Sequence, residues 1–149
     1  MKQTAMKKLH IPALIFVCLL ASNTLAQVSK RDRVISVKTV QGRTVGFEMG
    51  DYQHVTIKTR NGPKKSFFIM KPGLDYFLAL NKNSQLTLTY EIADVDLPET
   101  GGKTRIDRLT SAKAGKVSFE SWWKKVSRGN SLEQLDDKYG PLVKKYSLN

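Results

Sequence analysis

Few side chains in this sequence could carry out covalent chemistry. The 149 residues include one cysteine, Cys18, and two histidines, His10 and His54. A thiol nucleophile or a histidine-rich metal cluster needs several such groups together, and no serine here lies in the strand-to-helix turn that would let it pair with His54 in a hydrolytic triad. A solvated or hydrogen-bonded His54 is the simpler interpretation. The sequence therefore predicts a protein that is not an enzyme, with neither a metal site nor a cofactor.

Three carboxylates lie close together, at Asp94, Asp96 and Glu99. They could chelate a cation weakly, but a solvated loop is the interpretation we favour. The segment 97–101, LPETG, resembles the sorting signal that sortases read on Gram-positive surface proteins. That signal stands just before a C-terminal apolar span and a basic tail, and neither follows here. We therefore expect a proline-containing loop.

The segment 95–100, VDLPET, also resembles the stretch that carries metal and base carboxylates in thermonuclease-type enzymes, which are secreted, basic OB folds. That family needs an aspartate-rich turn after its first strand, where this chain has 41–44, QGRT, and an arginine just upstream of the motif, where it has Glu91. It also places its motif much earlier in the domain. Without these groups, calcium-assisted phosphodiester cleavage lacks its parts. A nuclease is an alternative that the sequence does not favour.

An excess of basic side chains is the clearest chemical signal. The chain has 25 lysines and arginines against 13 acidic residues, a formal charge of +12, and such a surplus attracts anions. We predict a ligand-binding face formed by Tyr52, Lys58, Arg60, Lys64 and Lys65. Nucleic acid is a partner that we do not favour, because bases stack on several outward aromatic rings and Tyr52 would stand nearly alone. A charge that only keeps the protein soluble is the alternative.

Two adjacent tryptophans form the second candidate surface. Phe119, Trp122, Trp123 and Val126 recur at helical spacing, and Gly129 is placed to end the helix. Packing in the core is the interpretation we favour for Trp122 and Trp123. Interaction with a partner or a membrane surface is the alternative.

The elements that must position these residues are mostly strands. Alternating apolar residues predict strands over about 34–40, 55–60, 64–70, 86–92 and 103–110, and over 45–49 as a continuation of the first strand or a strand after a turn at 41–44. The last strand is more polar than the rest, which places it at an edge of the sheet. Asn61-Gly62 predicts a hairpin with a type I′ turn.

Three helices complete the pattern. A short one is predicted from Leu74 to near Asn81, and two more follow residue 115. The last begins with the capping pattern of Ser131 and Gln134, and Gly140-Pro141 should end it, leaving Leu142, Val143 and Tyr146 to finish the chain with an apolar face.

Three strand segments, a short helix and two more strands resemble the element order of small exported OB-like domains of bacteria. The resemblance rests on the segments 34–37, VISV, 54–59, HVTIKT, and 86–94, and implies a mainly β fold: a five-stranded Greek-key barrel with a short helix between strands three and four. Residues 27–115 would form the barrel, and 116–149 a helical appendage packed on it. Such domains bind a nucleic acid strand, a glycan or another protein on the face of strands two and three, which here carries the basic residues.

Residues 1–26 are typical of a cleaved signal peptide. Three lysines precede the apolar run 11–21, and small residues precede a cleavage site after Ala26. A lipoprotein site at Cys18 is not favoured, because bulky Val17 precedes it. Cleavage would remove three lysines and no acidic residue, leaving a cysteine-free chain of formal charge +9 without a transmembrane segment. The short apolar run indicates a bacterial envelope, and we expect the periplasm, with an extracellular location as the alternative.

The sequence thus predicts a non-catalytic, exported binding domain. Its basic strand face would dock an anionic component of the envelope or a protein partner. The alternatives are a structural component of an envelope complex that uses Trp122 and Trp123, and the nuclease described above.

Overall fold

The computed structural model describes residues 32–148. The predicted signal peptide, including Cys18, lies outside these residues. The strands are β1 (Arg33–Glu48), β2 (His54–Thr59), β3 (Lys64–Ile69), β4 (Leu86–Leu97), β5 (Gly102–Ala114) and β6 (Val117–Ser118). The helices are α1 (Leu74–Leu80), α2 (Phe119–Val126) and α3 (Leu132–Lys145), with the short 3-10 helix η1 (Pro98–Thr100) between β4 and β5.

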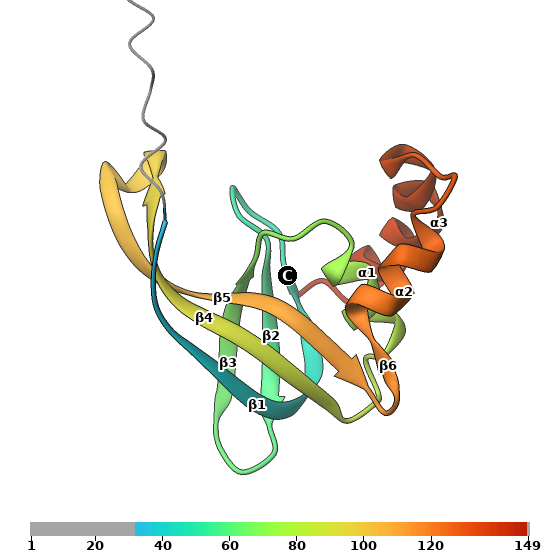
Figure 1. Ribbon diagram of the computed structural model, residues 1–149, viewed down its shortest axis with the longest axis horizontal. Coiled ribbons are helices and arrows are strands. Elements are labelled where there is room, and N and C mark those ends of the chain that lie inside the picture. The colour runs from blue at the N-terminus through green and yellow to red at the C-terminus, as the bar shows by residue number, and fades with distance from the viewer. Residues whose placement is uncertain (1–31, 149) are drawn as a thin grey trace, which may run out of the picture.

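The six strands form one sheet in the order β3-β2-β1-β4-β5-β6, and neighbours in this order are antiparallel. β3 also pairs with β5 in parallel, through Phe68↔Arg108 and Ile69↔Leu109, so that the sheet curls into a ring (Figure 1). The prediction of a mainly β fold is confirmed. The sheet has one strand more than predicted, because the chain turns back at Gly115 and adds the two residues of β6 to β5.

β1 is one long strand that serves two halves of the ring. Its first half pairs with β4 and its second half with β2, and the two ladders meet at Gly42, which pairs with both Leu86 and Thr59. A side chain on Gly42 would collide with Ile57 and the carbonyl of Lys58, since an atom of each lies within 2.7 Å of the place that its Cβ would take. Residues 41–44 therefore continue the strand, and the turn that their sequence allowed is absent from β1.

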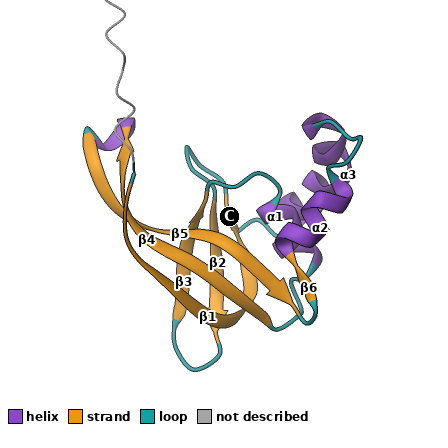
Figure 2. Ribbon diagram, in the orientation of Figure 1, coloured by secondary structure: helices purple, strands orange, loops and turns teal. Residues whose placement is uncertain are grey.

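The core fills the inside of the ring. Phe47, Val55, Ile57, Phe67, Leu88 and Leu109 supply it from the strands, and Phe77 and Leu78 from α1. Phe119 and Val143 join it from α2 and α3. The three helices of the described chain gather on one side of the sheet (Figure 2). The predicted short helix and the two C-terminal helices are thereby confirmed.

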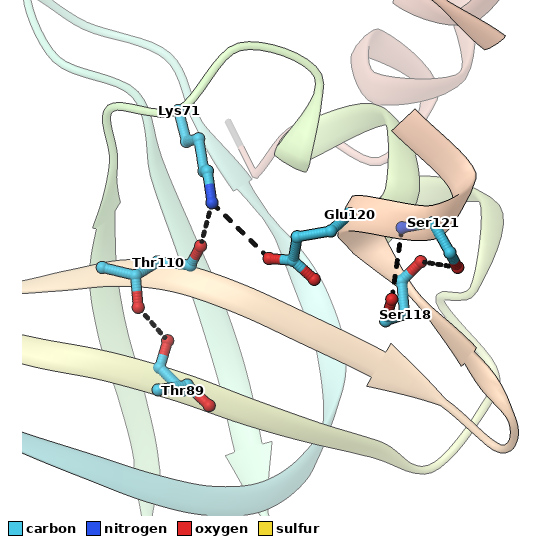
Figure 3. A network of polar contacts seen from close by, with 6 residues as sticks. All are labelled: Lys71, Thr89, Thr110, Ser118, Glu120 and Ser121. Carbon is cyan, nitrogen blue, oxygen red and sulfur yellow. Dashed lines mark hydrogen bonds and ion pairs between the residues drawn. The ribbon is translucent and has the colours of Figure 1, made fainter. Parts of the chain in front are cut away.

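Polar contacts fasten α2 to the sheet (Figure 3). Lys71 Nζ donates to the Thr110 carbonyl at 2.9 Å and pairs with Glu120 at 3.5 Å. Ser118 caps the helix by accepting a hydrogen bond from the Ser121 amide at 3.2 Å. Burial raises the pKa of Glu120, but hydrogen bonding by Ser111 and the nearby Lys71 outweigh it, so the net shift is downward.

The far ends of β4 and β5 extend beyond the ring, with η1 at their tip (Figure 1). They carry a second apolar cluster of Ala93, Val95, Leu97 and Ile106, against which Tyr52 and Phe68 pack. The prediction that the last long strand lies at an edge holds only for part of it: residues 102–107 of β5 pair with β4 alone, whereas Arg108 and Leu109 also pair with β3, and Lys113 and Ala114 with β6. Its polar residues reach partners on neighbouring strands, as Arg108 does with Glu91 at 2.9 Å.

Two turn predictions also need correction. The β2–β3 hairpin exists, but neither Asn61 nor Gly62 has positive φ, so its turn is not type I′. The last pair of the ladder is Lys58↔Lys64, and this wider connection does not need the twist of a two-residue loop. α3 runs through Gly140 and Pro141. Pro141 is exposed while Val143, two residues further on, is buried, and such burial offsets the roughly 3 kcal/mol that an internal proline costs.

No helix of residues 32–148 has the length and apolar character that crossing a bilayer requires.

Candidate basic ligand-binding face

Three basic side chains stand in register across three adjacent strands on the outside of the ring. Arg43 of β1 pairs with Lys58 of β2, and Lys58 pairs with Lys64 of β3. We call Arg43, Lys58 and Lys64 the basic row. All three are exposed. Because residues that face each other across a ladder point to the same side of the sheet, their charges lie side by side.

The basic row has no acidic partner within the described chain. The ion pairs of residues 32–148 join other side chains, and no carboxylate lies within 4.0 Å of a row nitrogen. Lys58 Nζ donates to the Gly62 carbonyl at 3.1 Å, which holds it over the hairpin turn. Like charges directly opposite each other destabilise a sheet by a few tenths of a kcal/mol per pair or more. The row therefore opposes folding, and a bound anion would relieve the repulsion.

Arg60 lies beside the row at the end of the hairpin. Its guanidinium donates to the Gln41 side-chain oxygen at 3.1 Å, and its amide donates to the Gln41 carbonyl at 2.8 Å. A pocket of about 290 Å³ is lined by Arg43, Lys58, Arg60 and Gln85, among others. Two of the predicted binding residues, Lys58 and Lys64, thus belong to the row, and Arg60 adjoins it.

Lys65 lies elsewhere. It pairs with the buried Ile57 and points to the inner side of the sheet, so Lys64 and Lys65 face opposite ways. Its Nζ lies 2.6 Å from Asp107 of β5 and 3.1 Å from the Tyr90 hydroxyl, and 4.3 Å from the centre of the Tyr90 ring. Burial lowers the pKa of Lys65, but its hydrogen bonds to Asp107 and Tyr90 raise the pKa by more than burial lowers it. The pKa of Lys65 is therefore above its ordinary value. Lys65 thus helps to hold β3 to β5.

Tyr52 is also separate from the row. It precedes β2, whereas Lys58 lies near the far end of that strand, about 13 Å beyond its first residue, His54, at the usual rise per residue. Its ring packs on Phe68, 6.0 Å between centroids, and its hydroxyl donates to the Glu99 carboxylate. This bond raises the pKa of Tyr52 and lowers that of Glu99. Tyr52 therefore ties the β1–β2 loop to the tip of the β4–β5 extension.

Trp122 and Trp123 are half-buried between the helices and the core. Trp122 packs on Phe77 at 5.6 Å and on Tyr139 at 5.5 Å, and Trp123 stacks on Phe119 at 6.1 Å between centroids. Contacts within the chain therefore account for much of the surface of both rings.

The other chemically suggestive residues have partners as well. His54 lies edge-on to Phe68, with 4.1 Å between ring centroids. Asp94 and Asp96 lie in β4 rather than in a loop, and Asp94 accepts a hydrogen bond from Arg105 at 3.0 Å, which lowers its pKa. Glu99 lies in η1.

A pocket of about 440 Å³ between α1 and α3 is lined by Asp75, Tyr76 and Asp136, among others. Burial raises the pKa of Asp75, although Gln53 donates to its carboxylate at 3.1 Å. Burial and a hydrogen bond to Asp136 raise the pKa of Tyr76 to about 12. The neutral phenol donates to Asp136 at 3.0 Å, so this pair joins α1 to α3.

Arg43 is the row residue that sequence reasoning missed, because the composition of 41–44 is typical of a turn.

Comparison of the chain with models of known protein families, with curated proteins and with solved structures finds no match.

Proposed function

We propose that this chain is an exported, non-catalytic binding domain whose basic row docks an anionic polymer of the bacterial envelope. The observation that carries the proposal is the register Arg43↔Lys58↔Lys64, three adjacent cations with no carboxylate among their described neighbours. A surface selected only for solubility would intersperse both signs of charge. A row that costs stability in isolation is instead suited to a ligand that neutralises it.

The dimensions of the row favour a polymer over a single small anion. Neighbouring strands lie about 4.8 Å apart, so the three side chains span about 10 Å before their own flexible reach is added. Arg43 can hold a sulfate or phosphate through two parallel hydrogen bonds, whereas Lys58 and Lys64 act as point charges. One strand of a sulfated or phosphorylated glycan could place successive anions on all three.

The sheet order supports an OB-like assignment for residues 33–114. Strand order 3-2-1-4-5, a β3–β5 contact that closes the ring, and a helix between β3 and β4 are what a five-stranded OB-like barrel requires, with β6 as an addition. Such domains use the face of strands two and three for binding, and the row spans that face and β1. This likeness supports a binding role and names no ligand.

The expected location outside the cytoplasm narrows the range of candidate ligands. The features of residues 1–26 support export, and outside the cytoplasm the abundant polyanions are lipopolysaccharide and acidic glycans rather than cellular nucleic acid. The pocket beside the row is lined by polar, basic and aliphatic residues, with no aromatic ring on which a base would stack. We therefore infer recognition through charge in the periplasm.

Binding of fluorescent dextran sulfate, with uncharged dextran as the negative control, tests the proposal. We expect the apparent affinity to fall about tenfold or more between 50 and 200 mM salt. Binding releases counterions from the polyanion, and a higher salt concentration opposes that release. The variant Arg43→Gln, Lys58→Gln, Lys64→Gln should bind about tenfold more weakly at low salt. A matched variant, Lys124→Gln, Lys125→Gln, Arg128→Gln, removes three exposed cations from the region of α2 and should change the affinity little.

The other outcomes contradict the proposal in distinct ways. Equal losses in both variants would mean that only net charge matters. Loss in the α2 variant alone would move the binding surface to that helix. Salt-independent binding that survives both variants would favour the role in which Trp122 and Trp123 make the contact.

A further inference from the structure

The first half of β1 pairs with β4 and the second half with β2, and in each half the opposite edge of the strand is not paired with either of them. Along the second half, the C-terminal segment covers that side. The Phe47 amide donates to the Tyr146 carbonyl at 3.0 Å, and the Leu148 amide donates to the Phe47 carbonyl at 2.7 Å. Phe47 and Ser147 form a parallel bridge there. The chain thus uses its own backbone to cover one of the two open sides.

Along the first half, no described residue forms a ladder on the side away from β4. Residues Arg33–Val40 pair with β4 alone, and the ladder to β2 begins only at Gly42. We call this side of Arg33–Val40 the free edge. The Gln41 carbonyl points to that side, since it accepts a hydrogen bond from the Arg60 amide at 2.8 Å. Alternate residues of a strand point the same way, so Val37 and Thr39 present their N–H and C=O groups to the free edge.

The side chains next to these groups are unusually apolar for an exposed strand. Val34, Ile35 and Val37 are 45%, 43% and 61% exposed. A β-bulge between Val34 and Ser36 is the only irregularity in the ladder that this half forms with β4. An exposed edge of β-branched residues is a ready template for a further strand, and proteins usually block such edges unless they use them.

The charged side chains within the free edge are positive. Arg33 and Lys38 lie within it, and Arg60 stands at its end, beside a pocket of about 430 Å³ that Thr39, Gln41 and Gly62 help to line. β1 contains no acidic residue before Glu48. A second copy of the chain would bring Arg33 and Lys38 against the same charges, which disfavours self-pairing. An acidic strand fits instead, as β4 does on the opposite side, where Asp94 faces Arg33 and Glu91 faces Val37.

We propose that the free edge binds an extended, acidic peptide segment of a partner protein, which adds a strand to the sheet beside β1. Backbone hydrogen bonds to Val37 and Thr39 supply the affinity. Val34, Ile35 and Val37 pack against the apolar side chains of the peptide, and a carboxylate near its end meets Arg60. This surface is separate from the basic row, and the inference does not depend on the proposed function.

The probe is a fluorescein-labelled peptide of alternating valine and glutamate, as long as the free edge, and the readout is fluorescence anisotropy. Val37→Pro removes the N–H that faces the free edge without touching the ladder to β4, and should weaken binding about tenfold or more. Val37→Thr keeps the N–H and the β-branched shape, and should bind about as the original chain does. A peptide with lysine in place of glutamate should also bind about tenfold more weakly.

Amide exchange in the unmodified protein keeps the inference testable if Val37→Pro unfolds. Peptide binding should slow exchange of the Val37 and Thr39 amides about tenfold or more, whereas the Lys38 amide, which faces β4, serves as the internal control. Unchanged exchange at Val37 and Thr39 would overturn the inference, and so would loss of binding in the variant that lacks the basic row. A dimer in sedimentation that Val37→Pro abolishes would also overturn it, in favour of a second copy.

Discussion

The α-carbon of Gly73 lies directly against the six-membered ring of Trp123, so that a Cβ on Gly73 would sit 2.0 Å from Trp123 Cζ3. Gly73 also has φ +77°, a left-handed conformation that side chains disfavour. It therefore meets two requirements at once: it is the N-cap residue of α1, and it makes room for the indole that docks α2.

Gly73→Ala should lower the free energy of unfolding by about 3 kcal/mol, because backbone strain and displacement of the indole add. Urea unfolding measures the loss, and tryptophan fluorescence should report the moved ring. Gly101→Ala is the matched control, since Gly101 has φ +72° and nothing within 4 Å of its Cβ position. It should cost only about 1 kcal/mol. Equal costs would mean that the packing on Trp123 contributes nothing.

Lys58→Glu should stabilise the fold while it weakens binding of dextran sulfate. A carboxylate between Arg43 and Lys64 converts two repulsive cross-strand pairs into attractive ones, worth about 0.5–1 kcal/mol in low salt. The gain should shrink at 1 M salt, where charges are screened within about 3 Å. Chemical unfolding at both ionic strengths measures it. A destabilised variant would show that the row does not repel itself.

Lys65→Gln and Lys64→Gln should differ although the residues are adjacent. Lys65→Gln breaks the contacts with Asp107 and Tyr90 and should cost about 1 kcal/mol. Lys64→Gln removes one repulsion with Lys58 and should leave stability unchanged or slightly raised. Thermal unfolding of the two variants measures the difference. Similar melting temperatures would contradict the placement of Lys64 and Lys65 on opposite faces of the sheet.

Tyr52→Phe should destabilise the protein at neutral pH more than in acid. The hydroxyl lowers the pKa of Glu99 in the folded state, so this contact contributes stability above the unfolded pKa of about 4.3. The contribution is lost as the pH falls through the lower folded pKa. Urea unfolding at pH 7 and near pH 3 should show a larger penalty at pH 7 than at pH 3, and NMR titration should find the Glu99 pKa raised in the variant. A penalty independent of pH would assign the effect to packing on Phe68.

Gly46→Ala should release the C-terminal segment from β1. A Cβ there would lie 2.6 Å from the Tyr146 carbonyl oxygen and 2.6 Å from Leu148 Cγ. Because the backbone oxygen cannot move alone, we expect a loss of about 2 kcal/mol and faster exchange of the Phe47 amide. Gly50→Ala is the control, with its nearest neighbour 3.9 Å away. An unchanged Phe47 amide would show that the segment adapts without leaving.

Local patterns in the sequence were sufficient for most elements. The two-residue period predicted β2, β3 and β4, and the spacing of Phe119, Trp122 and Trp123 predicted α2, because each signal depends on one face being buried. Ser131 and Gln134 form the predicted capping box. The helix between β3 and β4 followed from the helical spacing of Leu74, Phe77 and Leu78.

The errors arose where tertiary contacts decide. Residues 41–44 are rich in turn formers, yet pairing with both β2 and β4 keeps them extended, and this hid Arg43. The polarity of β5 indicated an edge along its whole length, whereas Asp107 and Arg108 meet charged partners on the neighbouring strands β3 and β4. Lys65 was grouped with Lys64 by proximity in sequence, although the period of a strand already places neighbours on opposite faces.

The long first strand also sets how this protein must fold. Arg33–Val40 gains its ladder only when β4 arrives, after β2, β3 and α1 have passed, and the β3–β5 seam waits for still later residues. Contacts so distant along the chain have a large loop-closure entropy, which slows folding to milliseconds or seconds for sheets of this kind. The ring can therefore close only once β5 is available.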